Sequence, residues 1–462
     1  MTLATSDSGG AGFTSRRHVS QATERLTMTF SIAQRRRRSA AAVALPVVAG
    51  MLLTACGSGD SGGSSNGGKE PQTITFTYAP ANAQDNSYEV LAKDYMAAHS
   101  GVTIKLNKIN AEAVNSTLTT QMQAGNGPDV MALTAGSGQA ATVGQFSKAG
   151  LLLELTDPSF ESDIPAAEKA GYAFDGKLYG VPSSTAVAGV VYNDELAKQT
   201  GITLDASSTL EDVLAACKTA RAAGQTVFGL AGSIPVNTGI MSVEIATSTV
   251  YGKDPDWNQK RAEGKTTFAK TQGWHDALQT VIDLNKNGCF QDGAAGAGFD
   301  ALTNGATSGK LYGFFAPSGA VKSIQDASGG HVKLIALPIP AAQGTDTYLA
   351  VTSDLGLAGN AKTESPKLVE DFLKFSVSPE EAKKYAEAAG TIPIGADVSS
   401  DLLPQYQPIA QMLADKKYRG FAVDEWPNGQ VYDALGTGVT GLLTGQKTID
   451  DVLEAMDAAW GS

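Results

Sequence analysis

Residues 73–133 carry the pattern that decides the fold class of this chain. In order they read TITFTY (73–78), SYEVLAKDYMAAH (87–99), VTIKLNKI (102–109), NAEAVNSTLTTQMQA (110–124) and DVMAL (129–133). The first, third and fifth segments have the composition of strands, whereas the second and fourth have the spacing of helices. Strands that alternate with helices in this way predict an α/β fold with a mainly parallel sheet and helices on both faces.

The same alternation continues toward the carboxyl end of the chain. The pattern predicts strands at 187–192, 226–231 and 333–337 and helices at 365–375 and 448–459. A chain of 462 residues is long enough for more than one domain, so we expect two α/β lobes.

The composition and charge of the chain limit its class and its partners. It is 42% hydrophobic and 18% charged, which is typical of soluble globular proteins and not of multi-span membrane proteins. The net charge is −12, although residues 1–55 contain seven Arg, no Lys and only two acidic residues. The remainder therefore carries −17 and repels phosphate backbones, so nucleic acid is not an expected partner.

Residues 1–55 have the layout of a signal peptide. The basic cluster Arg35–Arg38 precedes fifteen mostly apolar residues, 39–53, which are too few to span a membrane. Met28 is the expected start, because the residues before it show no hydrophobic periodicity.

The end of this leader points to a lipid anchor. Leu53-Thr54-Ala55-Cys56 resembles a bacterial lipobox, so we expect cleavage before Cys56 and acylation of that cysteine. Residues 56–70 are rich in Gly and Ser and read as a flexible tether. The alternative is a free cysteine in a discarded tail.

Two cysteines are left after processing, Cys217 and Cys289. An even number of cysteines in a chain that leaves the cytoplasm is typical of a disulfide. Cys217 falls on the apolar stripe of a helix opened by Thr209, and Cys289 follows Gly288, the expected end of another helix. Two buried thiols are the alternative, because only geometry decides whether the sulfur atoms can meet.

The search for enzyme motifs is negative. The mature chain contains three histidines, His99, His275 and His331, and none has a nucleophile or a metal ligand at a suitable spacing. We therefore expect no catalytic residues, no metal site and no cofactor.

Several short segments, taken in order, carry a family resemblance. They include GNGPDV (125–130), GLL (150–152), DGKLYGVP (175–182), VVYN (190–193), SPE (378–380), GTIP (390–393) and GQKTIDD (445–451). Over about residues 73–460 the set resembles the extracellular solute-binding proteins of ABC importers, in particular the maltose-binding-like group.

That resemblance implies a two-lobed periplasmic-binding-protein fold of type II, with a hinge between the lobes. We expect residues 71–185 and 339–378 to form the N-terminal lobe, and residues 186–338 and 379–462 to form the C-terminal lobe. Ligand contacts in such proteins come from loops at the rims of the cleft between the lobes.

When the family's rim loops are mapped onto this sequence, they contain hydroxyls, amides, carboxylates and aromatic rings. These are the groups that bind a sugar. Gln84, Thr134 and Gln139 lie in these loops. The expected ligand-binding residues are Tyr78, Asn82, Asp85, Ser137, Ser184, Asn237, Phe315, Ser318, Tyr348, Asp354, Trp426 and Tyr432. For each residue the alternative is structural, since aromatic side chains can belong to the core and Ser, Thr and Asn can close turns.

The resulting hypothesis is a monomeric, lipid-anchored receptor on the extracytoplasmic face of the cell membrane. It would bind a sugar or oligosaccharide and deliver it to the permease subunits of an ABC transporter. A binding protein for an amine, a peptide or a phosphate ester is the alternative, and an extracytoplasmic hydrolase is a third class, which the scarcity of histidine disfavours.

Overall fold

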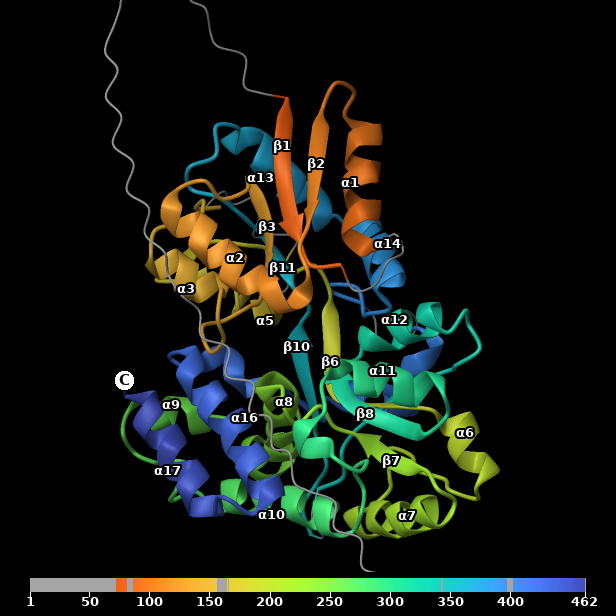
Figure 1. The fold of residues 1–462 in the computed structure, drawn as a ribbon. Helices are drawn as coiled ribbons and strands as arrows, with labels where there is room; N and C mark the ends of the chain where they lie inside the picture. The colour runs from red at the N-terminus through yellow and green to blue at the C-terminus, as the bar shows by residue number, and fades with distance from the viewer. Residues whose placement is uncertain are drawn as a thin grey trace, which may run out of the picture. The chain divides into compact units, whose positions relative to one another are not determined.

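The computed structural model describes residues 72–80, 86–155, 164, 166–341, 344–396 and 402–461. The chain separates by its contacts into two units, Met1–Gly67 and Gly68–Ser462, and all described residues belong to the second. Among them no helix is long and apolar enough to cross a membrane. The predicted α/β class is confirmed, because two separate sheets are each flanked by helices (Figure 1).

The smaller sheet organises what we call the small-sheet lobe. Its strand order is β11-β3-β1-β2, with β1 parallel to β2 and β3, and β11 antiparallel to β3. Ile74, Phe76 and Tyr78 of β1 are fully buried, as the pattern TITFTY predicts for a central strand. Its strands are β1 (Thr73–Tyr78), β2 (Thr103–Lys108), β3 (Val130–Leu133) and β11 (Gly356–Gly359).

Helices and a short hairpin surround this sheet. Helix α14 packs along α1, and α13 contacts β11. The helices are α1 (Ser87–Ala98), α2 (Ala111–Ala124), α3 (Val143–Lys148), α5 (Ala166–Lys169), α13 (Pro366–Ser376) and α14 (Pro379–Ala389), and the hairpin is β4 (Ala173–Phe174) with β5 (Lys177–Leu178).

The larger sheet organises the large-sheet lobe, and β6 is its hub. The strand order is β12-β10-β6-β8-β7, with β9 also paired to β6. The prediction of a mainly parallel sheet is wrong here, because β6 runs antiparallel to β8, β9 and β10. Its strands are β6 (Thr185–Tyr192), β7 (Thr226–Gly229), β8 (Leu311–Pro317), β9 (Ile335–Leu337), β10 (Leu349–Ser353) and β12 (Tyr418–Gly420).

The helices of this lobe pack mainly around α8 and α16, which contact each other extensively. The α-helices are α6 (Asp194–Gln199), α7 (Leu210–Ala222), α8 (Pro235–Ala246), α9 (Trp257–Ala262), α10 (Gln272–Lys286), α11 (Phe299–Thr307), α12 (Ala320–Ala327), α15 (Ala410–Ala414), α16 (Gly429–Thr444) and α17 (Ile449–Trp460). Shorter turns are the π-helix η1 (Thr247–Tyr251) and the 3-10 helices η2 (Ala294–Gly296), η3 (Pro404–Ile409) and η4 (Ala422–Glu425).

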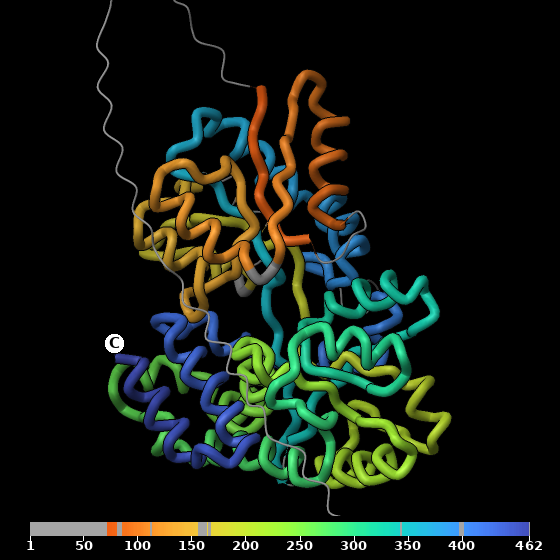
Figure 2. The backbone as a smooth tube through the Cα atoms, viewed as in Figure 1, coloured from red at the N-terminus to blue at the C-terminus, as the bar shows by residue number. Residues whose placement is uncertain are grey.

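The chain passes between the two lobes along three segments that are hydrogen-bonded to one another. The segment 181–185 leads into β6, the segment 353–356 joins β10 to β11, and the segment 390–393 follows α14. Val181 and Leu357 exchange two backbone hydrogen bonds, and so do Thr185 and Ile392. The first two passages are the yellow and teal tubes between the lobes in Figure 2.

The lobe boundaries expected from the sequence stay a prediction, and two observations favour moving them. The range 339–378 was expected in one lobe, yet β10 within it pairs with β6 of the large sheet, while β11 pairs with β3 of the small sheet. The range 379–462 was expected in the other lobe, yet its first helix, α14, packs on α1.

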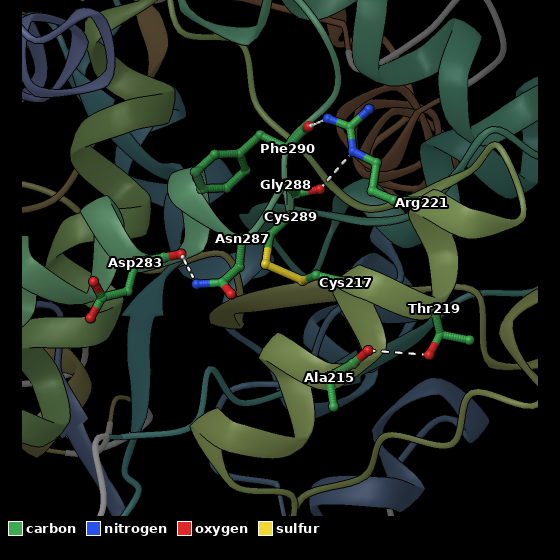
Figure 3. The surroundings of a disulfide bond; sticks show 9 residues. All are labelled: Ala215, Cys217, Thr219, Arg221, Asp283, Asn287, Gly288, Cys289 and Phe290. Carbon is green, nitrogen blue, oxygen red and sulfur yellow. Dashed lines mark hydrogen bonds between the residues drawn. A yellow bond between two sulfur atoms is a disulfide. The ribbon is translucent and has the colours of Figure 1, made fainter.

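A disulfide joins Cys217 of α7 to Cys289 after α10, with 4.8 Å between their Cα atoms (Figure 3). Both helix ends have the predicted signals: Thr209 and Asp212 form a capping box, and Gly288 has a φ of 70°. The Arg221 guanidinium also ties the two segments together by donating to the carbonyls of Gly288 (2.8 Å) and Phe290. The pairing that the sequence left open is thus present.

Candidate functional site

A cavity of about 710 Å³ lies where the three crossing segments meet the two sheets. Ala79 and Thr134 lie just beyond the carboxyl ends of β1 and β3 and line it from the small-sheet lobe. Ligands of open α/β sheets bind outside the carboxyl ends of parallel strands, so this position fits a binding site. The opposite wall comes from β8, α8, α11 and α12 of the large-sheet lobe.

Asp354 lies at the base of the cavity, between β10 and β11. Its backbone N–H donates to the Ser184 carbonyl (2.8 Å), and its own carbonyl accepts from the Tyr172 hydroxyl (3.2 Å). Burial raises the pKa of its carboxyl group, and hydrogen bonds from the Leu355 N–H and the Ser184 side chain oppose that shift. The chain therefore fixes Asp354 through its backbone and leaves the carboxylate at the cavity.

Two tyrosines from separate helices stand beside this carboxylate. Tyr88 lies in the first turn of α1, whose N-cap Asn86 accepts from the Tyr88 N–H (3.1 Å), and its hydroxyl donates to the Leu355 carbonyl (3.0 Å). Tyr385 of α14 packs against it with 5.3 Å between the ring centroids. The Tyr385 hydroxyl is buried and makes no hydrogen bond within the described part of the chain.

The rim of the small-sheet lobe supplies side chains that are available for a ligand. Thr134 and Gln139 line the cavity, and neither side chain hydrogen-bonds another described residue. The Gln139 carbonyl accepts from the Gln145 side chain, which fixes the loop. These hydroxyl and amide groups can donate to and accept from a polar ligand.

The large-sheet wall is mostly apolar. Ile240, Phe314, Phe421 and Tyr432 line it, and Phe299 and Val236 stand at its edge with 45% and 44% of their surface exposed. Large exposed apolar side chains next to a cavity are typical of ligand contacts. The first turns of α11 and α8 place these two residues there.

A second acid, Asp424 of η4, lies partly buried next to the cavity-lining Thr352. The Thr352 hydroxyl donates to its carboxyl group at 3.4 Å, and the Ser137 N–H donates to its backbone carbonyl at 3.0 Å. Burial raises the pKa of Asp424 to about 8, and the nearby negative charge of Glu425 adds to the effect.

Of the twelve expected ligand-binding residues, four line the cavity, six do not, and two lie outside the described residues. Those at the cavity are Asn237, Phe315, Asp354 and Tyr432. Asn82 and Asp85 lie outside the described residues, as does Cys56. The other six do not line the cavity, namely Tyr78, Ser137, Ser184, Ser318, Tyr348 and Trp426.

Contacts explain why some expected residues are structural. Trp426 is fully buried against Phe268 and Trp274, and its indole N–H donates to Asn258 (3.3 Å). These contacts favour the alternative that Trp426 is a core residue and does not bind the ligand. The Tyr348 ring lies under the Arg419 guanidinium, 4.3 Å from its centroid.

Hydrogen bonds to protein groups also occupy most of the expected polar side chains. Asn237 accepts from the Ala231 N–H and donates to the Phe315 carbonyl, so both ends of its amide are used although it lines the cavity. The Ser318 hydroxyl accepts from the Val187 N–H and from Tyr406, and the Ser184 hydroxyl accepts from Thr391.

The cavity residues that the sequence did not predict include Tyr88, Tyr385 and Phe299. Each belongs to a helix, whereas the family resemblance pointed to loops at the rims of the cleft. Phe299 carried a usable signal, since a large apolar residue directly after Gly298 begins a helix. Among the described residues no group of three or more His, Cys, Asp or Glu is placed to hold a metal ion.

Comparisons with known proteins agree with this geometry. Residues 90–412 match the family model described as "Bacterial extracellular solute-binding protein". The "Multiple sugar-binding protein" of Streptococcus mutans is 22% identical over 377 residues, which cover 80% of this chain and 85% of that protein.

Solved structures share the fold at low sequence identity. One from work on xylan utilization by Caldanaerobius polysaccharolyticus has a TM-score of 0.71 at 19% identity and covers 84% of this chain and 99% of its own. A sugar transporter protein of Bacillus licheniformis in complex with stachyose has a TM-score of 0.64 at 18% identity and covers 84% and 98%. With its two α/β lobes and the cavity at their crossing segments, the chain belongs to the bacterial extracellular solute-binding proteins, extracytoplasmic receptors that are not enzymes.

Proposed function

We propose that this protein is a lipid-anchored receptor that binds a sugar or oligosaccharide in the cavity and delivers it to an ABC transporter permease. The cavity carries the proposal. Its volume of about 710 Å³ lies within the range of about 300–1,000 Å³ that is usual for small-molecule sites. It combines an apolar wall with separate hydroxyl, amide and carboxylate groups, and a sugar has apolar ring faces and many hydroxyls.

Phe299 is the proposed platform for a sugar ring, and Thr134, Gln139 and Asp354 are the proposed polar contacts. Phe299 is 45% exposed, so a sugar ring that stacks on it removes apolar surface from water. Hinge closure over the three crossing segments would bring the Thr134 and Gln139 rim toward the ligand. The permease would then recognise the closed form.

Calorimetry with the purified full-length chain tests the proposal. The panel is raffinose, stachyose, xylobiose, maltose and cellobiose, the first three chosen because related structures come from proteins of raffinose, stachyose or xylan use. Saturation at 100 times the dissociation constant should raise the free energy of unfolding by about 2.7 kcal/mol. If none of the sugars binds or shifts the melting curve, the sugar assignment fails.

A matched pair of variants separates the platform from the fold. Phe299→Ala should weaken sugar binding about tenfold, because a stacked aromatic ring contributes of the order of 1 kcal/mol or more. Tyr418→Ala removes another partly exposed aromatic residue that does not line the cavity, and its affinity should equal that of the parent. Equal affinities for all three proteins would rule out Phe299 as the platform.

The lipid anchor rests on the leader and is tested separately. Cys56 follows a lipobox-like tripeptide and precedes a Gly/Ser tether. In a bacterial host the parent should fractionate with membranes, and Cys56→Ser should not. Mass spectrometry of the membrane fraction should find a diacylglyceryl group on Cys56. An unmodified Cys56 in that fraction would contradict the anchor.

A further inference from the structure

Some of the charged side chains at the cavity are paired with an opposite charge, and one is not. Within the described part of the chain, three charged side chains line the cavity, Lys322, Asp326 and Asp354. The Lys322 ammonium contacts both carboxylate oxygens of Asp326, at 2.5 and 2.6 Å, so these two charges compensate each other within α12. Asp354 forms no ion pair with a described lysine or arginine, and its partners are the Leu355 N–H and the Ser184 side chain. Among the described residues that line the cavity, Asp354 is thus the one charged group without a counter-charge.

The surroundings of Asp354 are those of a site for a cation. Tyr88 and Tyr385 line the cavity next to it, with their ring planes inclined by 59°. Tyr385 is only 2% exposed, and its hydroxyl makes no hydrogen bond of good geometry in the described chain, although the hydroxyl groups of Ser87, Tyr88 and Ser183 are near. A buried polar group without a partner is costly and points to a ligand that would satisfy it.

An ammonium group could compensate the Asp354 carboxylate and also hydrogen-bond the Tyr385 hydroxyl. It offers three N–H donors and a positive charge, so it can bind the carboxylate and the phenol oxygen together, while tyrosine ring faces attract it. A neutral hydroxyl has one donor and no charge, and it leaves the carboxylate uncompensated. A phosphate ester would meet Asp354 unfavourably, because the cavity's lysine is already paired.

We propose that the cavity selects saccharides that carry a protonated amino group, which Asp354, Tyr88 and Tyr385 bind at the base of the site. This inference rests on the proposed sugar-binding function and adds charge selectivity to it. A charge-assisted hydrogen bond is about twice as strong as a neutral one, so the preference for the amino sugar should be at least about tenfold.

Three disaccharides with the same linkage test the selectivity: the β-1,4-linked dimers of glucosamine, N-acetylglucosamine and glucose. Calorimetry on the full-length chain should give at least about tenfold tighter binding of the glucosamine dimer than of either neutral dimer. Asp354→Asn should reduce that ratio to about one, and Tyr385→Phe should reduce it about threefold, because only one acceptor is lost. Asp300→Asn, an exposed acid next to Phe299 that does not line the cavity, should keep the parent ratio.

The outcomes separate this inference from the proposed function. Neutral dimers that bind as tightly as the glucosamine dimer would overturn the charge selectivity and leave the sugar receptor standing. Binding of the glucosamine dimer alone, lost in Asp354→Asn at an unchanged melting temperature, would support the inference and restrict the proposed receptor to amino sugars. If Asp354→Asn does not fold, the Tyr385→Phe ratio decides, and a ratio equal to that of the parent overturns the proposal.

Discussion

Replacing Asp424 by Asn should remove a dependence of stability on pH. Asp424 belongs to η4, and the Thr352 hydroxyl is the one described side chain that donates to its carboxyl group. Burial raises its pKa to about 8 in the folded protein, against about 3.9 for an aspartate in an unfolded chain. Asn keeps an acceptor oxygen for Thr352 and carries no titrating proton.

The sign and size of the effect follow from proton linkage. Between about pH 5 and pH 7 the folded protein holds a proton on Asp424 that the unfolded chain has released, so the free energy of unfolding falls as the pH rises. The slope from this one group approaches about 1.4 kcal/mol per pH unit. Asp354 and Glu168 also have raised pKa values, and their contributions are shared by parent and variant. The difference between the two proteins therefore isolates Asp424.

Guanidinium unfolding curves at pH 5, 6, 7 and 8 measure this difference. With each rise in pH the free energy of unfolding of Asp424→Asn should increase relative to that of the parent. At pH 8 the variant should be more stable by a few kcal/mol. Asp451→Asn is the matched control, because Thr448 lowers the pKa of Asp451 in a capping box. Asp451 is then ionised throughout this range, and its effect should be constant. A constant difference for Asp424→Asn as well would refute the reasoning.

Two further variants test the large-sheet lobe. The double variant Cys217→Ser with Cys289→Ser should lose about 4 kcal/mol of unfolding free energy, because the disulfide closes a loop of 72 residues. A guanidinium midpoint that does not move would contradict it. Trp426→Ala should lose about 3–5 kcal/mol, because its ring is fully buried against Phe268 and Trp274. If the variant melts like the parent but no longer binds sugar, Trp426 is a ligand-binding residue and not a core residue.

Local signals were enough to predict many of the elements. The last helix was expected over 448–459 and spans Ile449–Trp460, because Thr448 caps it and its apolar residues recur at helical spacing. The helix expected over 365–375 spans Pro366–Ser376 for the same kind of reason. Both patterns depend on residues within one or two turns of each other, so they can be read without knowledge of the fold.

Sheet membership could not be predicted in this way. Strands β10 and β11 are separated by two residues, 354 and 355, yet they pair in different sheets. Their apolar residues fit either sheet equally well, and only pairing with β6 and β3 distinguishes the two. The antiparallel place of β6 depends likewise on partners that lie more than a hundred residues away in the chain.

The base of the cavity shows why a site of this kind is only half visible in a sequence. Asp354 could be predicted, because the family resemblance placed a rim segment of the cleft at its position. The residues that surround Asp354 come from distant parts of the chain: Tyr88 from α1, Ser184 from the first crossing segment, and Tyr385 from α14. The three hydrogen-bonded crossing segments bring these residues to one carboxylate. Selectivity for charge at Asp354 is therefore a property of how the lobes are joined, and variants that disturb the joint should alter the preference for amino sugars before they alter the fold of either lobe.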